Sequence, residues 1–213
     1  MKLRLAALAA MILLSACRHS GDLTSDNGGG VYAVRSDCPI PGIPAGTGDV
    51  TLFNPPQSIA AAALDVTATI TDLRATCQDA GDDVVSTATF TVVGLRRAPG
   101  PARQVVLPYF DVALRGGSEI AAKQIGQVAL NFEAGHLHAW ARVQATVRVN
   151  RAAAALPADV RATITQERKP GEAEAAVDPL SDPRVAKAVA NATFEHLIGF
   201  ELSQDQIKYN VTR

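Results

Sequence analysis

Aromatic residues are scarce in this chain. Only 5% of its 213 residues are aromatic, whereas Ala, Val and Thr are abundant. This balance favours extended β-structure with small inward-facing side chains over an aromatic-lined pocket. The formal net charge is only −1, which does not indicate the basic surface that nucleic-acid binding requires. We therefore expect no nucleic-acid partner.

Catalytic and ligand-binding motifs are also missing. The chain has no Gly-x-Ser-x-Gly sequence, and Gly116-Gly117 stands in a predicted turn rather than between a strand and a helix, where phosphate-binding loops lie. No repeat with a period of tens of residues is present, which argues against a solenoid or a propeller. We expect a protein without catalytic residues or a cofactor. The alternative is a hydrolase whose site has no recognisable motif.

No apolar run is long enough to cross a bilayer as a helix. The run from Leu5 to Leu14 is far shorter than the roughly 20 residues that a spanning helix needs. It follows Lys2 and Arg4 and ends at small residues, which is typical of a secretory signal peptide.

The four residues Leu14-Ser15-Ala16-Cys17 resemble the lipobox of bacterial lipoproteins. The resemblance covers about residues 1–17 and implies that the signal peptide, residues 1–16, is removed and that Cys17 carries the lipid anchor. Arg18, where inner-membrane lipoproteins have Asp, implies the outer membrane. The resemblance thus predicts a lipoprotein of the Gram-negative envelope that faces the periplasm. The alternative is an ordinary secretory signal with Cys17 near its cleavage site.

If Cys17 carries lipid, Cys38 and Cys77 remain as the only possible pair. Two leftover thiols in an oxidising periplasm usually pair. We predict a Cys38–Cys77 disulfide, and the alternative is two separately buried thiols. Residues 17–37 are rich in Gly, Ser and Asp and predict a flexible tether. The prolines between Cys38 and Pro44 predict an extended lead-in to a domain at residues 38–150.

Apolar residues alternate with polar ones over much of residues 49–150, which predicts strands with one buried face. The alternation is unbroken over residues 137–149, and its parity slips near Thr71-Asp72, which predicts a bulge. The five long strands are expected at residues 64–77, 84–95, 104–114, 120–132 and 137–149. Four short connections between them predict hairpins. We expect an antiparallel β-sandwich, immunoglobulin-like or fibronectin-like in general shape, with a small barrel as the alternative.

The period changes after Asn150, so residues 151–213 are expected to form a C-terminal helical segment. A helix should begin at Ser181 or Asp182, use Pro183 at its first turn and end at Gly199. Its apolar stripe includes Val185, Val189 and Leu197 and should pack on the sheet or on a partner. Ser203 to Gln206 resembles a capping box for a short last helix.

The strongest candidate binding face lies on the last long strand. His136, His138, Trp140 and Arg142 are predicted to point the same way, because residues two apart in a strand share a face. We expect a solvated polar face without a metal, with the C-terminal helix or a loop covering Trp140. The alternative is a binding patch built on Trp140 and Arg142.

Two functions other than hydrolysis fit these features. The first is a non-enzymatic lipid-anchored envelope protein, held to the membrane by Cys17, whose sandwich docks on another envelope protein. The alternative is a lipoprotein that binds a small ligand, a glycan or a metal through His136, His138 and Trp140.

Overall fold

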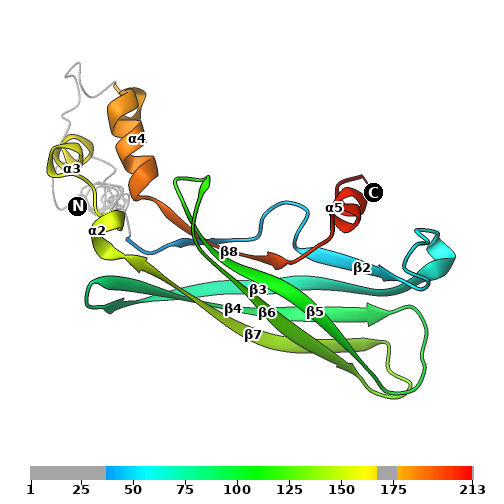
Figure 1. Cartoon of the computed structure of the whole chain (residues 1–213). Coiled ribbons are helices and arrows are strands. Elements are labelled where there is room, and N and C mark those ends of the chain that lie inside the picture. Colours follow the sequence, from blue (N-terminus) through cyan, green and yellow to red (C-terminus); the bar gives the residue numbers. More distant parts are fainter. Residues whose placement is uncertain (1–36, 167–176, 213) are drawn as a thin grey trace, which may run out of the picture.

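The computed structural model describes residues 37–166 and 177–212. Within them, eight strands form two four-stranded sheets that pack as an open sandwich, accompanied by helices (Figure 1). The predicted mainly β fold is therefore confirmed. Cys17 and the predicted signal peptide lie outside the described residues, as does all of the predicted tether except Asp37.

The first sheet, sheet B, has the strand order β2-β3-β4-β7. Its strands are β2 (Asp49–Phe53), β3 (Leu64–Ala80), β4 (Asp83–Arg96) and β7 (His138–Asn150), and all its pairings are antiparallel. The register of β3 against β4 shifts between Thr71 and Arg74, and Asp72 has a φ of 53°. The predicted bulge is confirmed, and it explains why the apolar parity of β3 changes there.

The second sheet, sheet A, has the order β1-β8-β5-β6. Its strands are β1 (Ile40–Gly42), β5 (Arg103–Arg115), β6 (Glu119–Phe132) and β8 (Phe194–Phe200). β1 runs parallel to β8, and the other pairings are antiparallel. The proline-rich lead-in therefore becomes a short edge strand, which tolerates proline because one of its sides is unpaired.

The predicted long C-terminal helix is wrong beyond Ala192. Helix α4 (Pro183–Ala192) ends there, and the next residues form β8 between β1 and β5. Leu197 and Gly199 thus belong to a strand. Burial alternates along this segment, with Phe194, His196 and Ile198 facing inward. A period of two is typical of a strand and does not fit a helix.

Only two of the four predicted hairpins form. β3 pairs with β4 and β5 pairs with β6, but the connections after β4 and after β6 pass from one sheet to the other. The guanidinium of Arg96 holds both crossing connections. It donates hydrogen bonds to the carbonyl oxygens of Gly100 and Pro101 in one connection and of Glu133 and His136 in the other.

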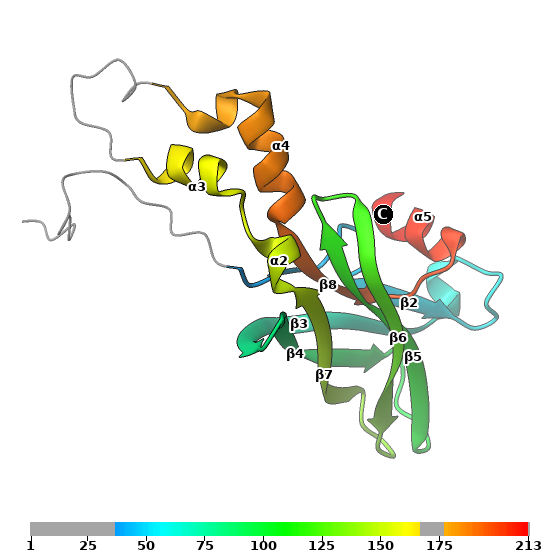
Figure 2. The ribbon, with the colours of Figure 1, turned by 60° about the vertical axis from the view of Figure 1, so that its left-hand side comes forward.

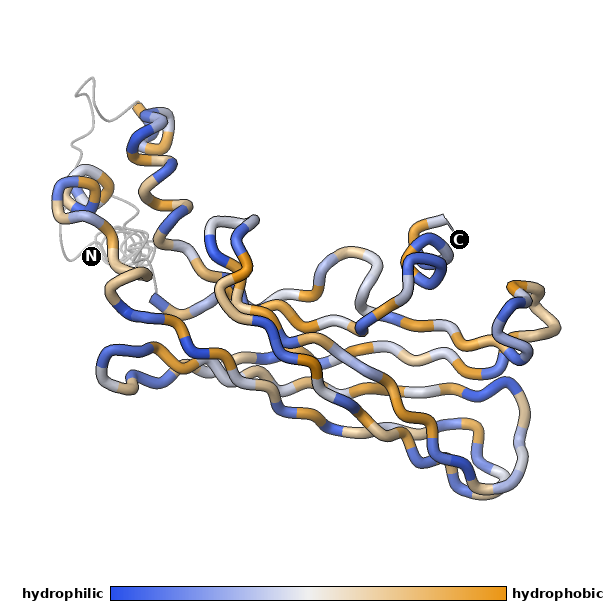
Figure 3. Tube along the Cα trace, viewed as in Figure 1, coloured by the Kyte–Doolittle hydropathy of each residue, from blue (hydrophilic) through white to orange (hydrophobic). Residues whose placement is uncertain are grey.

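The core lies between the two sheets. The hydropathy of the chain alternates along the strands, so each sheet turns one apolar face inward (Figure 3). Phe90, Phe132 and Phe200 are among the largest buried side chains, each about 1% exposed. A smaller group around Val84, Val149 and Phe194 extends the core toward the end of the sandwich that carries α2.

The helices gather at two places. Helices α2 (Arg151–Ala154), α3 (Ala158–Thr165) and α4 cluster at one end of the sandwich, whereas α5 (Gln204–Thr212) lies beside β2 (Figures 1 and 2). The short 3₁₀ helices are η1 (Ala61–Ala63) and η3 (Pro179–Ser181). The predicted capping box at α5 is confirmed, because Ser203 and Gln206 exchange side-chain to backbone hydrogen bonds.

Candidate functional site

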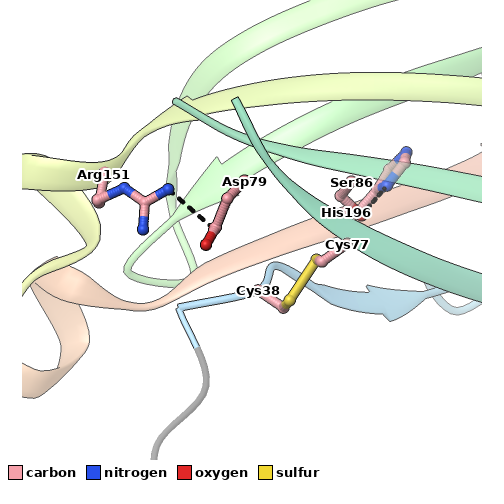
Figure 4. The surroundings of a disulfide bond; sticks show 6 residues. All are labelled: Cys38, Cys77, Asp79, Ser86, Arg151 and His196. Carbon is pink, nitrogen blue, oxygen red and sulfur yellow. Dashed lines mark hydrogen bonds and ion pairs between the residues drawn. A yellow bond between two sulfur atoms is a disulfide. The ribbon is translucent and has the colours of Figure 1, made fainter. Parts of the chain in front are cut away.

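The predicted disulfide between Cys38 and Cys77 is present, with Cα atoms 5.9 Å apart (Figure 4). It joins the segment just before β1 to the last part of β3, and so connects sheet A with sheet B. Cys77 is the register partner of Ser86 on β4. The disulfide therefore lies beside Ser86, whose hydroxyl makes a hydrogen bond with His196 of sheet A.

The four residues of the predicted face are only partly brought together. His138, Trp140 and Arg142 lie on β7 and are exposed on the outer side of sheet B. His136 precedes the strand and lies in the turn, where its Nε2 is 3.8 Å from a carboxylate oxygen of Glu133. The expected two-histidine pair on one strand is therefore wrong, because β7 begins at His138.

Trp140 is not covered by a helix or a loop of the described chain. Its side chain is 71% exposed, and its cross-strand neighbour on β4, Val93, is 39% exposed. The next pair on the same face of the sheet joins Leu95, which is 42% exposed, to His138. The expectation of a covered tryptophan is thus wrong for the described residues. Sheet B presents an exposed apolar patch of Trp140, Val93 and Leu95, named here the Trp140 patch.

A shallow hollow of about 430 Å³ lies beside the Trp140 patch on the same sheet. It is named here the bulge hollow, and it is lined by Asp72, Arg74, Thr89, Phe90, Thr91 and Arg142. The bulge of β3 sets its shape, because Arg74 resumes pairing opposite Thr89 only after two unpaired residues. Across β4, Arg142 of β7 pairs with Thr91. The guanidinium groups of Arg74 and Arg142 make no ion pair with any other described residue.

Sequence reasoning missed a buried polar network between the sheets. His196 of β8 is 0% exposed, and its Nε2 lies 2.8 Å from Oδ1 of Asp111 on β5. Its Nδ1 lies 2.9 Å from Oγ of Ser86 on β4 (Figure 4). This Ser86–His196–Asp111 network spans both sheets, since Ser86 belongs to sheet B and the other two residues to sheet A.

The network has the residue types of a Ser-His-Asp triad, but its setting suits a structural role. Ser86 is 0% exposed and Asp111 is 4% exposed, so a substrate has no path to the serine hydroxyl in this conformation. When the imidazole is neutral with its proton on Nε2, it donates to Asp111 and accepts from the Ser86 hydroxyl. Both ring nitrogens then have a hydrogen-bond partner, as buried polar atoms in folded proteins generally do.

The sequence did carry a signal for this network. In β4, Ser86 stands at an inward-facing position, in the same alternation as the buried residues Val84, Ala88 and Phe90. Asp111 likewise shares the inward parity of Leu107 and Tyr109 in β5. A polar residue at an inward strand position needs a buried partner. The partner was missed because His196 was assigned to a helix.

The described residues contain no cluster of three or more His, Cys, Asp or Glu side chains placed to hold a metal ion. Within the same residues, no helix is both long and apolar enough to span a membrane. An apolar pocket of about 300 Å³ lies between β2 and α5 and includes Phe53, Ile59 and Tyr209.

Comparison with known proteins gives no relative: no protein-family model, curated protein or solved structure matches this chain. Functional inference therefore depends on the geometry of the Trp140 patch, the bulge hollow and the buried network.

Proposed function

We propose that this protein is a non-enzymatic, lipid-anchored protein of the bacterial cell envelope and acts as an interaction module. Its anchor is Cys17, in a sequence that resembles a lipobox, and its folded domain faces the periplasm from the outer membrane. The Trp140 patch docks on another envelope protein. The burial of Ser86 and His196 supports a role without catalysis.

The observation that carries this proposal is the exposure of Trp140 beside Val93 and Leu95. An indole that is 71% exposed on the outer face of sheet B, with apolar neighbours on the next strand, is not contributing to the core. Tryptophan and arginine are the residues that most often dominate binding energy at protein interfaces. Arg142 lies two residues from Trp140 on the same face, so an arginine stands directly beside the Trp140 patch.

A crosslinking experiment in intact cells tests the docking role. A photoreactive amino acid replaces Trp140 in one variant and Ile120 in a control variant, and crosslinked partners are identified by mass spectrometry. Ile120 is a suitable control because it is 61% exposed but lies on β6 of the other sheet. We expect one defined envelope protein crosslinked from position 140 and not from position 120.

The anchor and the patch can be tested separately. Cys17→Ala should release the protein from the membrane and abolish recovery of the partner, whereas Trp140→Glu should abolish recovery while the protein stays anchored. Ile120→Glu should leave recovery unchanged. If position 140 crosslinks nothing that position 120 does not, the docking role is wrong.

The second candidate function is binding of a small ligand, a glycan or a metal on the face that includes His138 and Trp140. The bulge hollow favours the glycan among these ligands, because it places charged and hydroxyl side chains next to the indole. His136, in the turn, does not extend this face. Titration with divalent metals, followed by the fluorescence of Trp140, tests the metal alternative.

A further inference from the structure

We infer that the bulge hollow, together with Trp140, binds an acidic glycan, that is, a sugar bearing carboxylate or phosphate groups. This inference rests on the second candidate function and deepens it, since it names the ligand class and the residues that would recognise it, and it shares Trp140 with the proposed docking role. It is carried by three features of the described residues: two arginines without ionic partners, a row of threonine hydroxyls and an exposed indole.

The arginines supply the charge recognition. Arg74 on β3 and Arg142 on β7 flank β4 from its two sides, opposite Thr89 and Thr91 respectively. Strand spacing and rise place their Cα atoms roughly 12 Å apart, within reach of two long side chains that converge on one anionic group. Guanidinium groups bind carboxylates and phosphates through paired hydrogen bonds. Asp72 also lines the hollow and offsets one of the two arginine charges. The net charge of the lining therefore stays positive.

Two threonines line the hollow between the arginines and form its floor. They are Thr89 and Thr91, both half-buried on β4, whereas the hydroxyl of Thr71 on β3 is already used, because it donates to the backbone carbonyl of Thr91. Each hydroxyl donates one hydrogen bond and accepts others, and the Asp72 carboxylate only accepts. A ligand that matches this floor must itself carry both donors and acceptors. Sugar hydroxyls have this property.

The centre of the hollow argues against a peptide strand as the ligand there. β4 is paired on both sides, by β3 and β7, so its backbone groups are already used in the ladder. β2 pairs with β3 only over residues 64–69, so it does not cover the edge of β3 at Arg74. A peptide that adds to a sheet needs a free strand edge. Recognition over β4 must therefore use side chains.

Trp140 completes the site. It lies two residues from Arg142 on the same face of β7, some 6–7 Å along the strand. An exposed indole ring is a flat apolar surface on which the apolar face of a sugar ring can pack, while its N–H stays available to a hydroxyl. The hollow, at about 430 Å³, falls in the size range of small-ligand sites.

Trp140 is the only tryptophan of the chain, so its fluorescence reports on this site alone. The full-length protein in detergent is titrated with trigalacturonate as the carboxylate probe and with glucose 6-phosphate as the phosphate probe. Maltotriose is the neutral sugar, inorganic phosphate is the anion without a sugar, and an oligoglutamate with the charge of trigalacturonate is the acidic peptide. Isothermal calorimetry provides an independent reading of each titration.

We expect a saturable change with trigalacturonate or glucose 6-phosphate, and binding that is at least about tenfold weaker with maltotriose, inorganic phosphate or oligoglutamate. The double variant Arg74→Gln/Arg142→Gln should lose at least about tenfold in affinity for the acidic sugar. Arg148→Gln is the matched control, because Arg148 is exposed on the same face of β7 but does not line the hollow. It should change the affinity by less than about twofold, since it removes only a screened, more distant charge.

Several results would overturn the inference. Absence of binding by both acidic sugars in fluorescence and calorimetry would do so, as would oligoglutamate or phosphate binding as tightly as the sugars. Equal losses in Arg148→Gln and in the double variant would show general charge attraction instead of a site. None of these results affects the crosslinking from position 140, so failure of the glycan site and failure of the docking role remain distinguishable.

Discussion

Oγ of Ser86 lies 2.9 Å from Nδ1 of His196, and this hydrogen bond joins sheet B to sheet A inside the sandwich. The other ring nitrogen of His196 is held by Asp111 at 2.8 Å. The imidazole is thus fixed at both nitrogens in a site that water does not reach. An arrangement that resembles a hydrolytic triad by composition therefore links the two sheets through buried hydrogen bonds.

The first prediction concerns Ser86→Ala. The substitution leaves Nδ1 of His196 buried without a partner, so we expect the free energy of unfolding to fall by about 1–3 kcal/mol. Urea unfolding followed by circular dichroism measures the change. Ser118→Ala, in the exposed turn between β5 and β6, is the control and should lie within about 0.5 kcal/mol of wild type. Equal stability of both variants would mean that the Ser86 hydrogen bond contributes nothing.

The same serine gives a prediction about reactivity. Because Ser86 is 0% exposed, we expect a fluorophosphonate reagent, which labels activated serines, to leave it unmodified in the folded protein. Mass spectrometry of the intact protein and of its peptides gives the readout. Labelling of Ser86 under native conditions would contradict a purely structural network and support the hydrolase alternative.

The third prediction concerns the disulfide. Cys38 and Cys77 are separated by 39 residues, and the chain-entropy model predicts that losing this crosslink lowers stability by about 4 kcal/mol. The Cys38→Ser/Cys77→Ser variant should unfold at correspondingly lower urea. Since Cys77 pairs in register with Ser86, we also expect the loss to be coupled to Ser86→Ala by more than about 0.5 kcal/mol in a double-mutant cycle. Strict additivity would show that the crosslink and the buried network act independently.

The fourth prediction concerns Arg96, which is 5% exposed and bonds carbonyl oxygens of both sheet-crossing connections. Lysine keeps the charge but cannot present donors to four carbonyls in the planar guanidinium geometry. Arg96→Lys should therefore destabilise the fold by at least about 2 kcal/mol. Arg148→Lys, at an exposed position of β7, is the comparison and should be nearly neutral. A small loss in both variants would mean that the two connections hold their positions without Arg96.

The fifth prediction concerns pH and Tyr109. Burial, and to a lesser extent the Asp111 carboxylate, raise the pKa of the Tyr109 hydroxyl above its ordinary value. The unfolded chain therefore loses this proton first, and the stability contributed by the neutral hydroxyl is present below about pH 10 and falls as the pH rises above it. Tyr109→Phe should flatten the loss of stability between about pH 9 and pH 11, because phenylalanine has no proton to lose. Chemical unfolding across this range, with Tyr209→Phe for comparison, checks the prediction. An unchanged alkaline slope in Tyr109→Phe would contradict it.

Short-range features of this fold were predictable. Residues 137–149 predicted β7, and the parity slip at Thr71-Asp72 predicted the bulge, because side-chain direction in a strand depends only on local backbone geometry. The disulfide was predictable from cysteine number alone once Cys17 was set aside. The class of fold follows from these elements, since strands with one apolar face must bury it against another layer.

Long-range relationships were not predictable. The inward positions of Ser86 and Asp111 indicate that each needs a buried partner, but no local pattern indicates that both meet His196 on a third strand. The order of strands in each sheet, and hence which connections are hairpins, also depends on how the sheets pack and not on any one segment. The helical assignment of residues 193–199 failed for this reason, because sheet pairing with β1 and β5 outweighed a helix-compatible spacing.

The sequence by itself determined where the five long strands lie, where the bulge falls and which cysteines pair, because each of these follows from local spacing or from counting. Only the tertiary structure decided that Trp140 is exposed while His196 is buried. Both outcomes depend on which surfaces the packed sheets cover. That is set by contacts between residues far apart in the chain, whose pairing no local pattern encodes.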